Sequence, residues 1–580
     1  MALGKYYVDV IDVSQMDYAS RLTAASLQGL ANRNGPCVFL DYGIYDDISV
    51  RKTNETFLSD ELWFSKYRSA IGNIDQNNLE YYRTVYDIEP NHLNNLLTAL
   101  RKHADFFEGT VVWDPDLQDT VNIALMLGGL ENLLVIHPDM IEPVESELGL
   151  KIVQDLRGRW HNRISLYSWA FKHLFKRCVE GRVACVEPGW GRTEFADYIV
   201  QNRLFVYSLT AFEKGRLFSM GQKLLYLLIG GPKTLLDLMF GLRLDGLVRR
   251  AGLALMGLGS AEVRLATRIQ RAVKGTPYPT LFGWHTCRDD EISFMVHLSA
   301  NGMRLIPSHL SGNFSFHGRL PGSVEFVQDH IQYESVQLEQ DKVYLTFVLS
   351  DGDQMMMMNS NELGNWRLKE RGKVPFNWET QPLLIQIAPA LLGKYYATLT
   401  DADYLIAGPS GAGYVIPPLV PRLKDYLKET SDICRSADIR VITSYIANPP
   451  RRVIKQHGTV PGNILGYLAG YAHFGGTPEY VTGSQAFIAN KVPHVEHLHD
   501  DCRQTLEAVR KLVDEPGPTP KFISVHLFAY RTMISDVYDF VQTLDQDRVK
   551  VVRADEFLTA ALKYKYSLQG RSKNEYGTRS

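Results

Sequence analysis

Strand-like and helix-like segments alternate regularly along the second half of this chain, and that alternation restricts its fold more than any other feature. Between residues 275 and 566, apolar runs of strand type are separated by amphipathic segments, which gives about seven or eight strand–helix units. Units of this kind pair as a parallel sheet with its helices on the outside. We therefore expect a TIM-like (β/α) barrel over residues 275–566, with its functional residues at the carboxyl ends of the strands.

The first part of the chain, residues 1–212, shows a related but less regular alternation. Its pattern predicts a strand over Tyr6–Val13, a helix over Ser20–Ala31, a strand over Pro36–Leu40 and a helix over Asn91–His103. This order is typical of an α/β fold, so we expect an N-terminal α/β domain of Rossmann-like type. No G-x-G-x-x-G fingerprint follows a predicted strand, so dinucleotide binding is not expected and we predict no cofactor.

Residues 213–274 differ from both flanking regions because they are rich in leucine and in basic residues. Between residues 216 and 274 there are ten Lys and Arg against three acids, a net charge of about +7. An apolar and basic helical segment is suited to lying on a membrane surface. The alternative is a helical insertion that packs on its own domain or forms an oligomer contact with a second subunit. The sequence leaves both alternatives open.

The composition is that of a folded protein with several domains. The chain has 580 residues, of which 45% are hydrophobic and 22% charged, and its net charge of −3 gives no global field for nucleic acid. Its six cysteines form no C-x-x-C pair. No signal segment or membrane-spanning run is recognisable, so we expect a cytoplasmic location unless a leader has been removed. The polar residues 567–580 predict a disordered tail.

The strand predicted over Val343–Ser350 ends in two acids, and this segment carries the strongest functional signal. The strand is apolar on both faces, which indicates a buried parallel strand, and Asp351 and Asp353 follow it. Gly352 between them lets the backbone turn sharply, so both carboxylates can face one crevice. The alternative for Asp353 is structural, since Asp is a good N-cap for a helix expected to begin at Gln354.

Polar and aromatic residues also follow the other predicted barrel strands. The candidate catalytic acids are Asp351 and Asp353, together with Glu291 and Asp289 after the first predicted barrel strand. Aromatic faces stack on sugar rings while polar groups hold the hydroxyls, so a mixture of the two suits a carbohydrate or glycoconjugate ligand. The candidate substrate-binding residues are Trp284, His285, Asn313, Trp378, Glu379, Ser410, Tyr414, Tyr445, Tyr471, His526 and Tyr530.

Two further clusters are interpreted as structural. His494, His497 and His499 lie before a predicted helix, and we interpret them as a capped surface turn, so no metal site is predicted. Four consecutive methionines, Met355–Met358, favour adaptable core packing. The alternative is that one of them lies near the barrel mouth and offers a soft surface to a more apolar ligand.

The segment GPSGAGYVIP, residues 408–417, resembles the motif that names the GxGYxYP family, whose members are grouped with glycoside hydrolases on the basis of their architecture. The segments LQGLANRNGP (27–36) and FGWHTCRDDE (282–291) are also similar to that family. The resemblance implies an N-terminal α/β region before a TIM-like barrel, and it supports carbohydrate hydrolysis by analogy.

The resemblance extends to individual positions and also has gaps. The second tyrosine of the motif is Ile416 in this chain, and residues 216–274 are an insertion relative to the family. The positions that match the family pattern are Trp284, Asp351, Asp353, Gly411, Gly413, Tyr414 and Pro417.

Three functions fit these residues. The first is a glycosidase-like hydrolase in which one carboxyl acts as general acid and another as nucleophile or base. The second is a metal-dependent hydrolase similar to polysaccharide deacetylases, which also have a strand ending in Asp-x-Asp, with His526 or His473 as ligands. The third is a non-catalytic scaffold that binds a glycan or lipid-glycan and docks on membranes or partners through residues 216–274.

Overall fold

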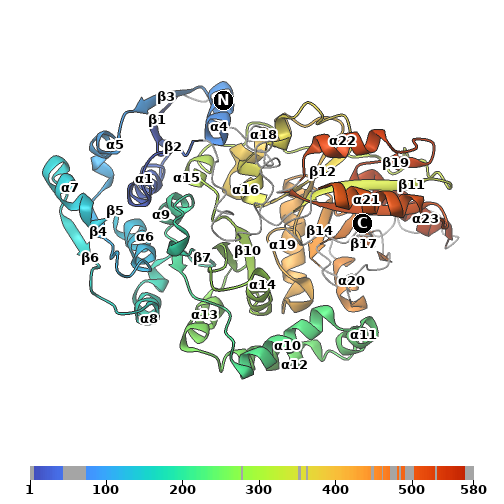
Figure 1. Ribbon diagram of the computed structural model, residues 1–580, viewed down its shortest axis with the longest axis horizontal. Helices are drawn as coiled ribbons and strands as arrows, with labels where there is room; N and C mark the ends of the chain where they lie inside the picture. Colours follow the sequence, from blue (N-terminus) through green and yellow to red (C-terminus); the bar gives the residue numbers. More distant parts are fainter. Residues whose placement is uncertain are drawn as a thin grey trace.

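The structure is a computed structural model of the chain. It describes residues 5–43, 73–275, 278–350, 354–360, 364–445, 450–459, 462–470, 480–482, 485–489, 502–529 and 532–568. The fold is mixed α/β, as expected, with small parallel sheets in the N-terminal half and a larger, barrel-like parallel sheet in the C-terminal half (Figure 1).

Three small sheets precede the barrel-like sheet, and all their strand pairs are parallel. In each sheet, the strand that comes first in the sequence (β1, β4 or β7) lies between the next two strands of that sheet. The strand orders are β2-β1-β3, β5-β4-β6 and β10-β9-β7-β8. Rossmann-like sheets bind ligands where the strand order reverses, beside that first strand. The strands are β1 (Tyr6–Asp12), β2 (Val38–Asp41), β3 (Ile88–Leu93), β4 (Gly109–Val112), β5 (Leu133–Ile136), β6 (Ile152–Asp155), β7 (Arg182–Cys185), β8 (Phe205–Tyr207), β9 (Thr280–Gly283) and β10 (Arg304–Pro307).

Helices connect and cover these strands. The longest of the described N-terminal helices, α1, begins at an Asp17 cap, and it packs on both β5 and α9, so it joins neighbouring sheets. The helix predicted over Asn91–His103 begins later than expected, because residues up to Leu93 pair with β1 as β3. The N-terminal helices are α1 (Tyr18–Ala31), α4 (Ile74–Tyr86), α5 (Leu96–Lys102), α6 (Thr120–Glu131), α7 (Ile141–Leu148), α8 (Arg163–His173) and α9 (Ala196–Asn202).

Strands β9 and β10, which we expect from the sequence to open the barrel, belong to the third small sheet. Thr280 of β9 lies opposite Arg182 of β7, and β10 extends the same sheet beyond β9. The third sheet therefore takes strands from both sides of the 213–274 segment, and residue 275 does not separate two sheets. The apolar pattern identifies a strand, but it does not identify the strand with which it pairs.

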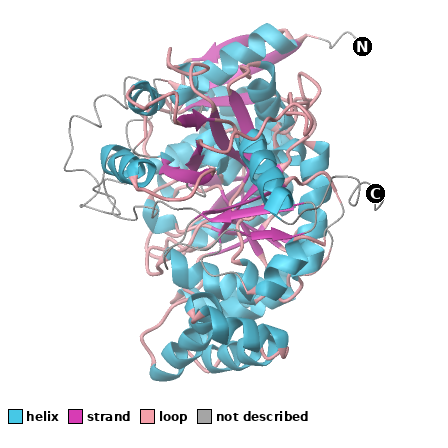
Figure 2. Cartoon of the chain, turned by 90° about the vertical axis from the view of Figure 1, so that its right-hand side faces the viewer, coloured by secondary structure: helices cyan, strands magenta, loops and turns pink. Residues whose placement is uncertain are grey.

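The 213–274 segment forms a helical insertion between β8 and β9, along one edge of the molecule (Figures 1 and 2). Among the described helices, none is long and apolar enough on its own to cross a membrane, and α10 and α11, which pass that test together, are bent by 100°. The helices α10 and α12 pack on each other. The four helices are α10 (Arg216–Gly230), α11 (Lys233–Gly241), α12 (Asp245–Met256) and α13 (Ala261–Ala272).

The C-terminal sheet has the order β16-β17-β15-β14-β13-β12-β11-β18, with β19 also paired to β11, and only β16 is antiparallel to its neighbour. In the part of the chain that the structure describes, β16 and β18 are the edges of this order. Its strands are β11 (Val343–Ser350), β12 (Phe376–Thr380), β13 (Asp403–Ala407), β14 (Val441–Tyr445), β15 (Gly466–Gly470), β16 (Tyr480–Thr482), β17 (Gln485–Ala489), β18 (Lys521–Phe528) and β19 (Val549–Val551).

Helices alternate with these strands as in a (β/α) barrel. The last of them runs to Leu568, two residues into the segment predicted to be a disordered tail, and residues 569–580 lie outside the described part. The remaining helices are α14 (Glu291–Ala300), α15 (Phe314–His317), α16 (Gln354–Asn359), α17 (Leu384–Ile387), α18 (Pro389–Ala397), α19 (Leu423–Ser436), α20 (Arg451–His457), α21 (Cys502–Asp514), α22 (Ile534–Gln542) and α23 (Ala554–Leu568).

The two faces of the C-terminal sheet differ in their neighbours. On the outer face, Phe347 of β11 packs on Phe540 of α22. On the opposite, inner face, Tyr344, Val348 and Phe522 form an apolar cluster with α23. Successive side chains of a strand alternate between the two faces of a sheet. In β11 and β18, side chains an even number of residues from Val348 or Phe522 therefore also point to the inner face.

Candidate functional site

A buried carboxylate lies at the carboxyl ends of the strands of the C-terminal sheet. Glu379, in β12, is fully buried and accepts hydrogen bonds from Ser350 Oγ at 3.1 Å, from Gln354 Nε2 at 2.5 Å and from Thr443 Oγ1. Ser350 ends β11, Gln354 begins α16, and Thr443 lies in β14. Four elements therefore meet at one carboxylate, whose oxygens act as acceptors for three donors.

The strand pairing explains how these side chains meet. The register of β11 with β12 places Ser350 and Glu379 on the same inner face. Strand β13 lies between β12 and β14, and Gly408 follows it. A Cβ at Gly408 would overlap both the carboxyl group of Glu379 and the hydroxyl of Thr443. The glycine therefore leaves the space through which Thr443 reaches Glu379.

Strand β18 brings His526 to the same face. His526 lies opposite Val348 in the parallel pairing of β18 with β11, and it is 2% exposed. Ser350 is two residues beyond Val348, so both point to the inner face. The structure thus places His526 on the face that also carries Glu379.

A second carboxylate, Glu291, is hydrogen-bonded to one tyrosine, which packs on another. Tyr414 donates its hydroxyl hydrogen to Glu291 Oε1 at 3.1 Å, and its ring centre lies 5.3 Å from that of Tyr445. Burial raises the pKa of both tyrosines well above the usual range, so they remain neutral at ordinary pH. Tyr445 is two residues beyond Thr443 on β14, which sets it about 7 Å further along the strand than the contact with Glu379.

Trp284 and His285 belong to an aromatic group at the carboxyl ends of the third small sheet. The Trp284 ring stacks on His309 at 5.3 Å, and Trp190 lies edge-on to His285 at 5.8 Å and to His309 at 5.2 Å. These residues follow β7, β9 and β10, where a Rossmann-like sheet reverses its strand order. Burial lowers the pKa of both histidines. Trp190 is not among the residues predicted from sequence, because it lies outside the expected barrel.

Asp289 is held by groups of the surrounding fold. Its carboxylate accepts hydrogen bonds from Ala211 N at 3.0 Å, from Thr286 Oγ1 at 3.1 Å and from Thr210 Oγ1. Burial raises its pKa, and these donors oppose the rise. The partners lie in the segments that follow β8 and β9, so Asp289 fastens these segments together. Its placement favours a structural role over the predicted catalytic one.

Trp378 is the neighbour of Glu379 but faces the other way. Its indole Nε1 donates to Asp403 Oδ1 at 2.8 Å, and its ring packs on Trp366 in the layer that contains α18. Alternation along β12 allows only one of the two consecutive residues to face inward, and that residue is Glu379. The predicted contact of Trp378 with substrate is not supported by this placement.

Asn313 and Ser410, both predicted to bind substrate, are engaged with the main chain. Asn313 donates to Leu40 O at 2.9 Å and accepts from Leu40 N, which fastens the loop after β10 to β2. Ser410 donates to Val415 O at 2.8 Å and accepts from Tyr445 N at 3.0 Å. Both residues therefore hold loops in place.

The Gly-rich loop after β13 is a joint between the C-terminal sheet and the third small sheet. Tyr414 and Leu305 of β10 exchange main-chain hydrogen bonds of 2.7 and 2.9 Å. Gly413 has a φ of +100°, and a Cβ there would lie 2.7 Å from Arg304 Cδ. From the sequence we expect these glycines to let the backbone approach a ligand. In the structure they let it approach β10 instead.

Arg304 completes this joint and has its donors satisfied. The buried guanidinium donates to Thr280 Oγ1 at 2.8 Å and to Ala412 O at 3.0 Å, and it forms an ion pair of 2.8 Å with Glu429. Ala412 belongs to the Gly-rich loop and Glu429 to α19. One side chain of β10 thus ties the third sheet to two parts of the C-terminal half.

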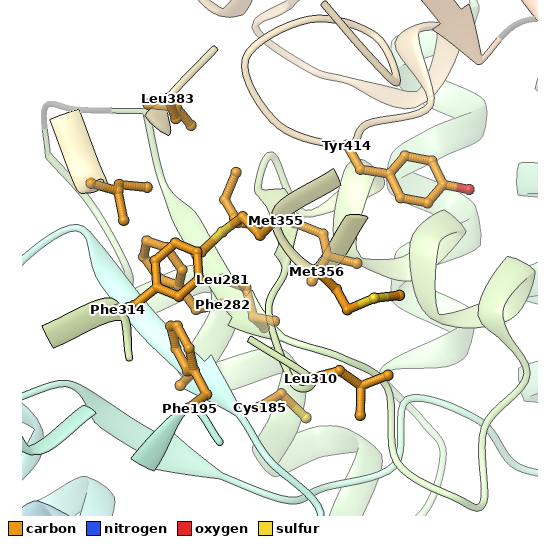
Figure 3. Close-up of a cluster of buried hydrophobic side chains, with 14 of the residues drawn as sticks. Cys185, Phe195, Leu281, Phe282, Leu310, Phe314, Met355, Met356, Leu383 and Tyr414 are labelled. Atoms are coloured by element: carbon orange, nitrogen blue, oxygen red, sulfur yellow. The ribbon is translucent and has the colours of Figure 1, made fainter. Parts of the chain in front are cut away.

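The methionine run is core packing, as favoured by the sequence. All four side chains of Met355–Met358 are at most 2% exposed. Figure 3 shows Met355 and Met356 among Phe314, Leu310 and residues of the third sheet. Helix α16 is therefore wedged between that sheet and β12, against which it also packs.

Several predicted residues lie outside the described part of the chain. They are Asp351, Asp353, Tyr471, Tyr530, His473 and the histidines His494, His497 and His499. Among the residues that the structure does describe, no group of three or more His, Cys, Asp or Glu side chains is arranged to hold a metal ion.

Comparison with known proteins identifies related chains. Residues 341–561 match the domain described as "GxGYxYP putative glycoside hydrolase C-terminal domain", and residues 107–178 match the "GxGYxYP_N second domain". The second match coincides with the small sheet β5-β4-β6. No curated protein matches the sequence.

A solved structure shares the fold along nearly the whole chain. It is the crystal structure of a "putative hydrolase" from Bacteroides thetaiotaomicron, with a TM-score of 0.73 and 17% sequence identity. The similarity covers 97% of this chain and 96% of the other, so the three small sheets, the insertion and the C-terminal sheet fall within the range of the comparison. The two domain matches, which together span about half of the residues, show that the chain belongs to the GxGYxYP family.

Proposed function

We propose that this protein hydrolyses glycosidic bonds in a carbohydrate or glycoconjugate, with Glu379 as a reacting carboxylate. The observation that carries the proposal is the position of Glu379, fully buried at the carboxyl ends of β11, β12 and β14. Barrel enzymes keep their active sites at that end. Burying a carboxylate is costly unless donors compensate, and Ser350, Gln354 and Thr443 are arranged to do so.

Glycoside hydrolysis needs two carboxyl groups with different roles. One protonates the leaving oxygen, and the other attacks the anomeric carbon or activates a water. Because three donors point at Glu379, its oxygens are held as acceptors, which suits the nucleophile or the base. Asp351 and Asp353, which follow Ser350 in the sequence, remain predicted candidates for the acid. Glu291 is a further candidate.

Aromatic side chains support a sugar ligand. Trp284 and Trp190 are only partly buried. An indole face matches the apolar face of a pyranose ring. The family description names a glycoside hydrolase and the similar structure is described as a hydrolase, and both support the same class of reaction by analogy.

The experiment is a screen of the purified full-length protein against a panel of glycans and acetylated glycans. New reducing ends measure glycoside hydrolysis, and released acetate measures deacetylation. We expect new reducing ends from at least one glycan, and their loss in Glu379→Gln. Acetate release without new reducing ends, sensitive to chelation, would replace this proposal with the deacetylase alternative.

A second proposal concerns the helical insertion, which we propose docks the protein on an anionic lipid surface. Eight of the fourteen large hydrophobic side chains that are exposed in the described residues belong to this insertion. Apolar side chains on the outside of a helix gain free energy when they enter the membrane interface. The eight are Leu217, Met220, Leu235, Leu238, Leu242, Leu244, Leu247 and Leu258.

The charges of the insertion favour a lipid over a second protein subunit. The three acids between residues 216 and 274 form ion pairs within the fold: Asp237 pairs with Lys233 at 3.1 Å, Asp245 with Arg452 at 3.4 Å, and Glu262 with Arg288 at 2.6 Å. Within the described residues, Arg216, Lys223, Arg243 and Arg250 form no ion pair. Unpaired cations beside exposed leucines match the anionic headgroups and the acyl chains of a bilayer.

Vesicle sedimentation tests this docking. We expect the full-length protein to bind vesicles that contain phosphatidylglycerol more strongly than vesicles of phosphatidylcholine alone. The double variant Leu238→Glu, Leu242→Glu should lose most of this binding, whereas the same change at exposed Val324 and Val327, outside the insertion, should not. A subunit interface would be indicated instead if neither the unmodified protein nor the Leu238→Glu, Leu242→Glu variant bound vesicles, and if the unmodified protein formed dimers that this variant did not form.

A further inference from the structure

A polar cavity lies where the first sheet, the third sheet and α16 meet. Its volume is ≈ 140 Å³, and its walls come from segments that follow β1, β2, β7, β10 and β11. Residues at its wall include Arg21 of α1, Asp75 of α4, Arg192, Glu194 and Asn359 of α16. Segments that follow five strands thus line one small space, in a part of the molecule where sequence analysis placed no site.

Arg21 is the unusual member of this group. Within the described residues, its side chain forms no ion pair, and its buried Nε has no hydrogen-bond partner. Elsewhere in the core, the guanidinium of Arg304 has three partners. A partly buried cation that forms no ion pair is costly, and a bound anion would reduce that cost.

The other polar groups of the cavity complement Arg21. Arg192 lies 2.9 Å from Glu194, so a second guanidinium is present but already has one partner. Asn359 uses its Oδ1 to accept from Asn78, which leaves its amide nitrogen as a donor. The wall therefore supplies one cation without an ion pair, one cation paired with Glu194, a neutral donor and the carboxyl group of Asp75.

We infer that this cavity binds the oxyanion group of a small ligand, a carboxylate, sulfate or phosphate, with Arg21 as its main contact. A guanidinium presents two parallel N–H donors to two oxygens of such a group, which gives both strength and orientation. The volume is below that of a pocket for a whole drug-sized ligand. It therefore fits a small acid or the charged end of a larger molecule.

This site is separate from Glu379, although α16 contacts both. Gln354 at the start of α16 binds Glu379, and Asn359 at its end lines the cavity. Asn359 is five positions after Gln354, a rise of about 7.5 Å along the helix. The inference does not rest on glycoside hydrolysis, since an oxyanion binds Arg21 whether or not Glu379 takes part in a reaction.

Direct binding of sulfate to the full-length protein tests this site, by calorimetry with Arg21→Gln as the variant. Loss of one charged, bidentate contact should weaken sulfate binding by about tenfold to hundredfold. The matched control is Arg101→Gln, an exposed arginine of α5 that pairs with Glu147, and it should bind sulfate as the unmodified protein does. Arg21→Lys keeps the charge and should restore part of the affinity.

Two comparisons make the result decisive. Glucuronate, phosphate and glucose, each titrated separately, distinguish a carboxylate ligand from a phosphate ligand and from an uncharged sugar, and we expect the anions to bind and glucose not to. Glu379→Gln should bind sulfate normally, so failure of this site and failure of the hydrolase proposal give different results. Equal sulfate affinity in Arg21→Gln and the unmodified protein, or no saturable binding of any of the three anions, would overturn the inference.

Discussion

The two ends of α16 contact two polar regions that differ in how their charges are satisfied. At one end, the carboxylate of Glu379 is fully buried and receives three donors. At the other end, Arg21 lines a cavity, forms no ion pair among the described residues, and has a buried Nε without a hydrogen-bond partner. A charge that the protein already holds in a fixed geometry is suited to chemistry, because no reorganisation is needed during a reaction. A charge left unpaired is suited to binding a ligand that supplies the counter-charge.

The largest expected effect is a loss of activity in a variant of Glu379. Glu379→Gln should lower kcat by about 10²- to 10⁴-fold on a glycan that the unmodified protein hydrolyses. The reacting carboxyl group is lost, while the shape of the side chain is kept. Glu339→Gln, at a half-buried glutamate near the start of β11, is the matched control and should leave kcat unchanged. A Glu379→Gln variant with full activity would remove Glu379 from the reaction and end the contrast between the two regions.

The next largest effect concerns the Gly-rich loop after β13, which joins the C-terminal sheet to the third small sheet. Gly413→Ala should lower the free energy of unfolding by about 2 kcal/mol or more, because alanine is strained at a φ of +100° and its Cβ would press on Arg304. Gly241→Ala, at the end of α11 with open space around it, is the control and should change stability by less than about 1 kcal/mol. Denaturant titration of both variants measures the difference, and equal stabilities would mean that the Gly-rich loop is not a tight joint.

A smaller effect is expected of pH on the affinity of the cavity for sulfate. Burial raises the pKa of Asp75 to about 7, and Asp41 and Glu194 add to the rise, while hydrogen bonds from Tyr42 N and Asn313 oppose it. Below that pKa Asp75 is neutral, and above it Asp75 is ionised. Its negative charge beside Arg21 and Arg192 then competes with a bound anion, so sulfate affinity should fall as the pH rises through about 7.

Calorimetry with sulfate between about pH 6 and pH 8 measures this change, because the charge of sulfate is constant over that range. Asp75→Asn should flatten the dependence while it keeps hydrogen-bonding capacity at that position. A pH dependence that survives in Asp75→Asn would assign the titration to another group and weaken the description of the cavity as an anion site.

The sequence predicts some of these features well for a simple physical reason. The apolar run of β11 ends at Ser350, as predicted, because a strand buried on both faces gives a clear signal and polar residues end it. The helical character of 213–274 and the packing of Met355–Met358 follow from composition in the same way.

Other features depend on contacts that no local pattern encodes. The pattern at β9 and β10 identifies two strands, but only their pairing with β7 assigns them to the third sheet. Trp378 and Glu379 are adjacent in the sequence, and only the neighbours of β12 decide which of them faces inward. Arg21 lies in an ordinary amphipathic helix, so nothing around it in the sequence indicates that it lines a cavity.

Chemical rescue tests the central claim most directly. The variant Glu379→Ala removes the carboxylate, and a small external nucleophile such as azide or formate can enter the space that the side chain leaves. We predict that the variant is folded and nearly inactive on the responsive glycan, and that azide or formate restores turnover with a concentration dependence absent from Glu339→Ala. A folded Glu379→Ala variant with the turnover of the unmodified protein, unaffected by either nucleophile, would contradict the assignment of Glu379 as the reacting group.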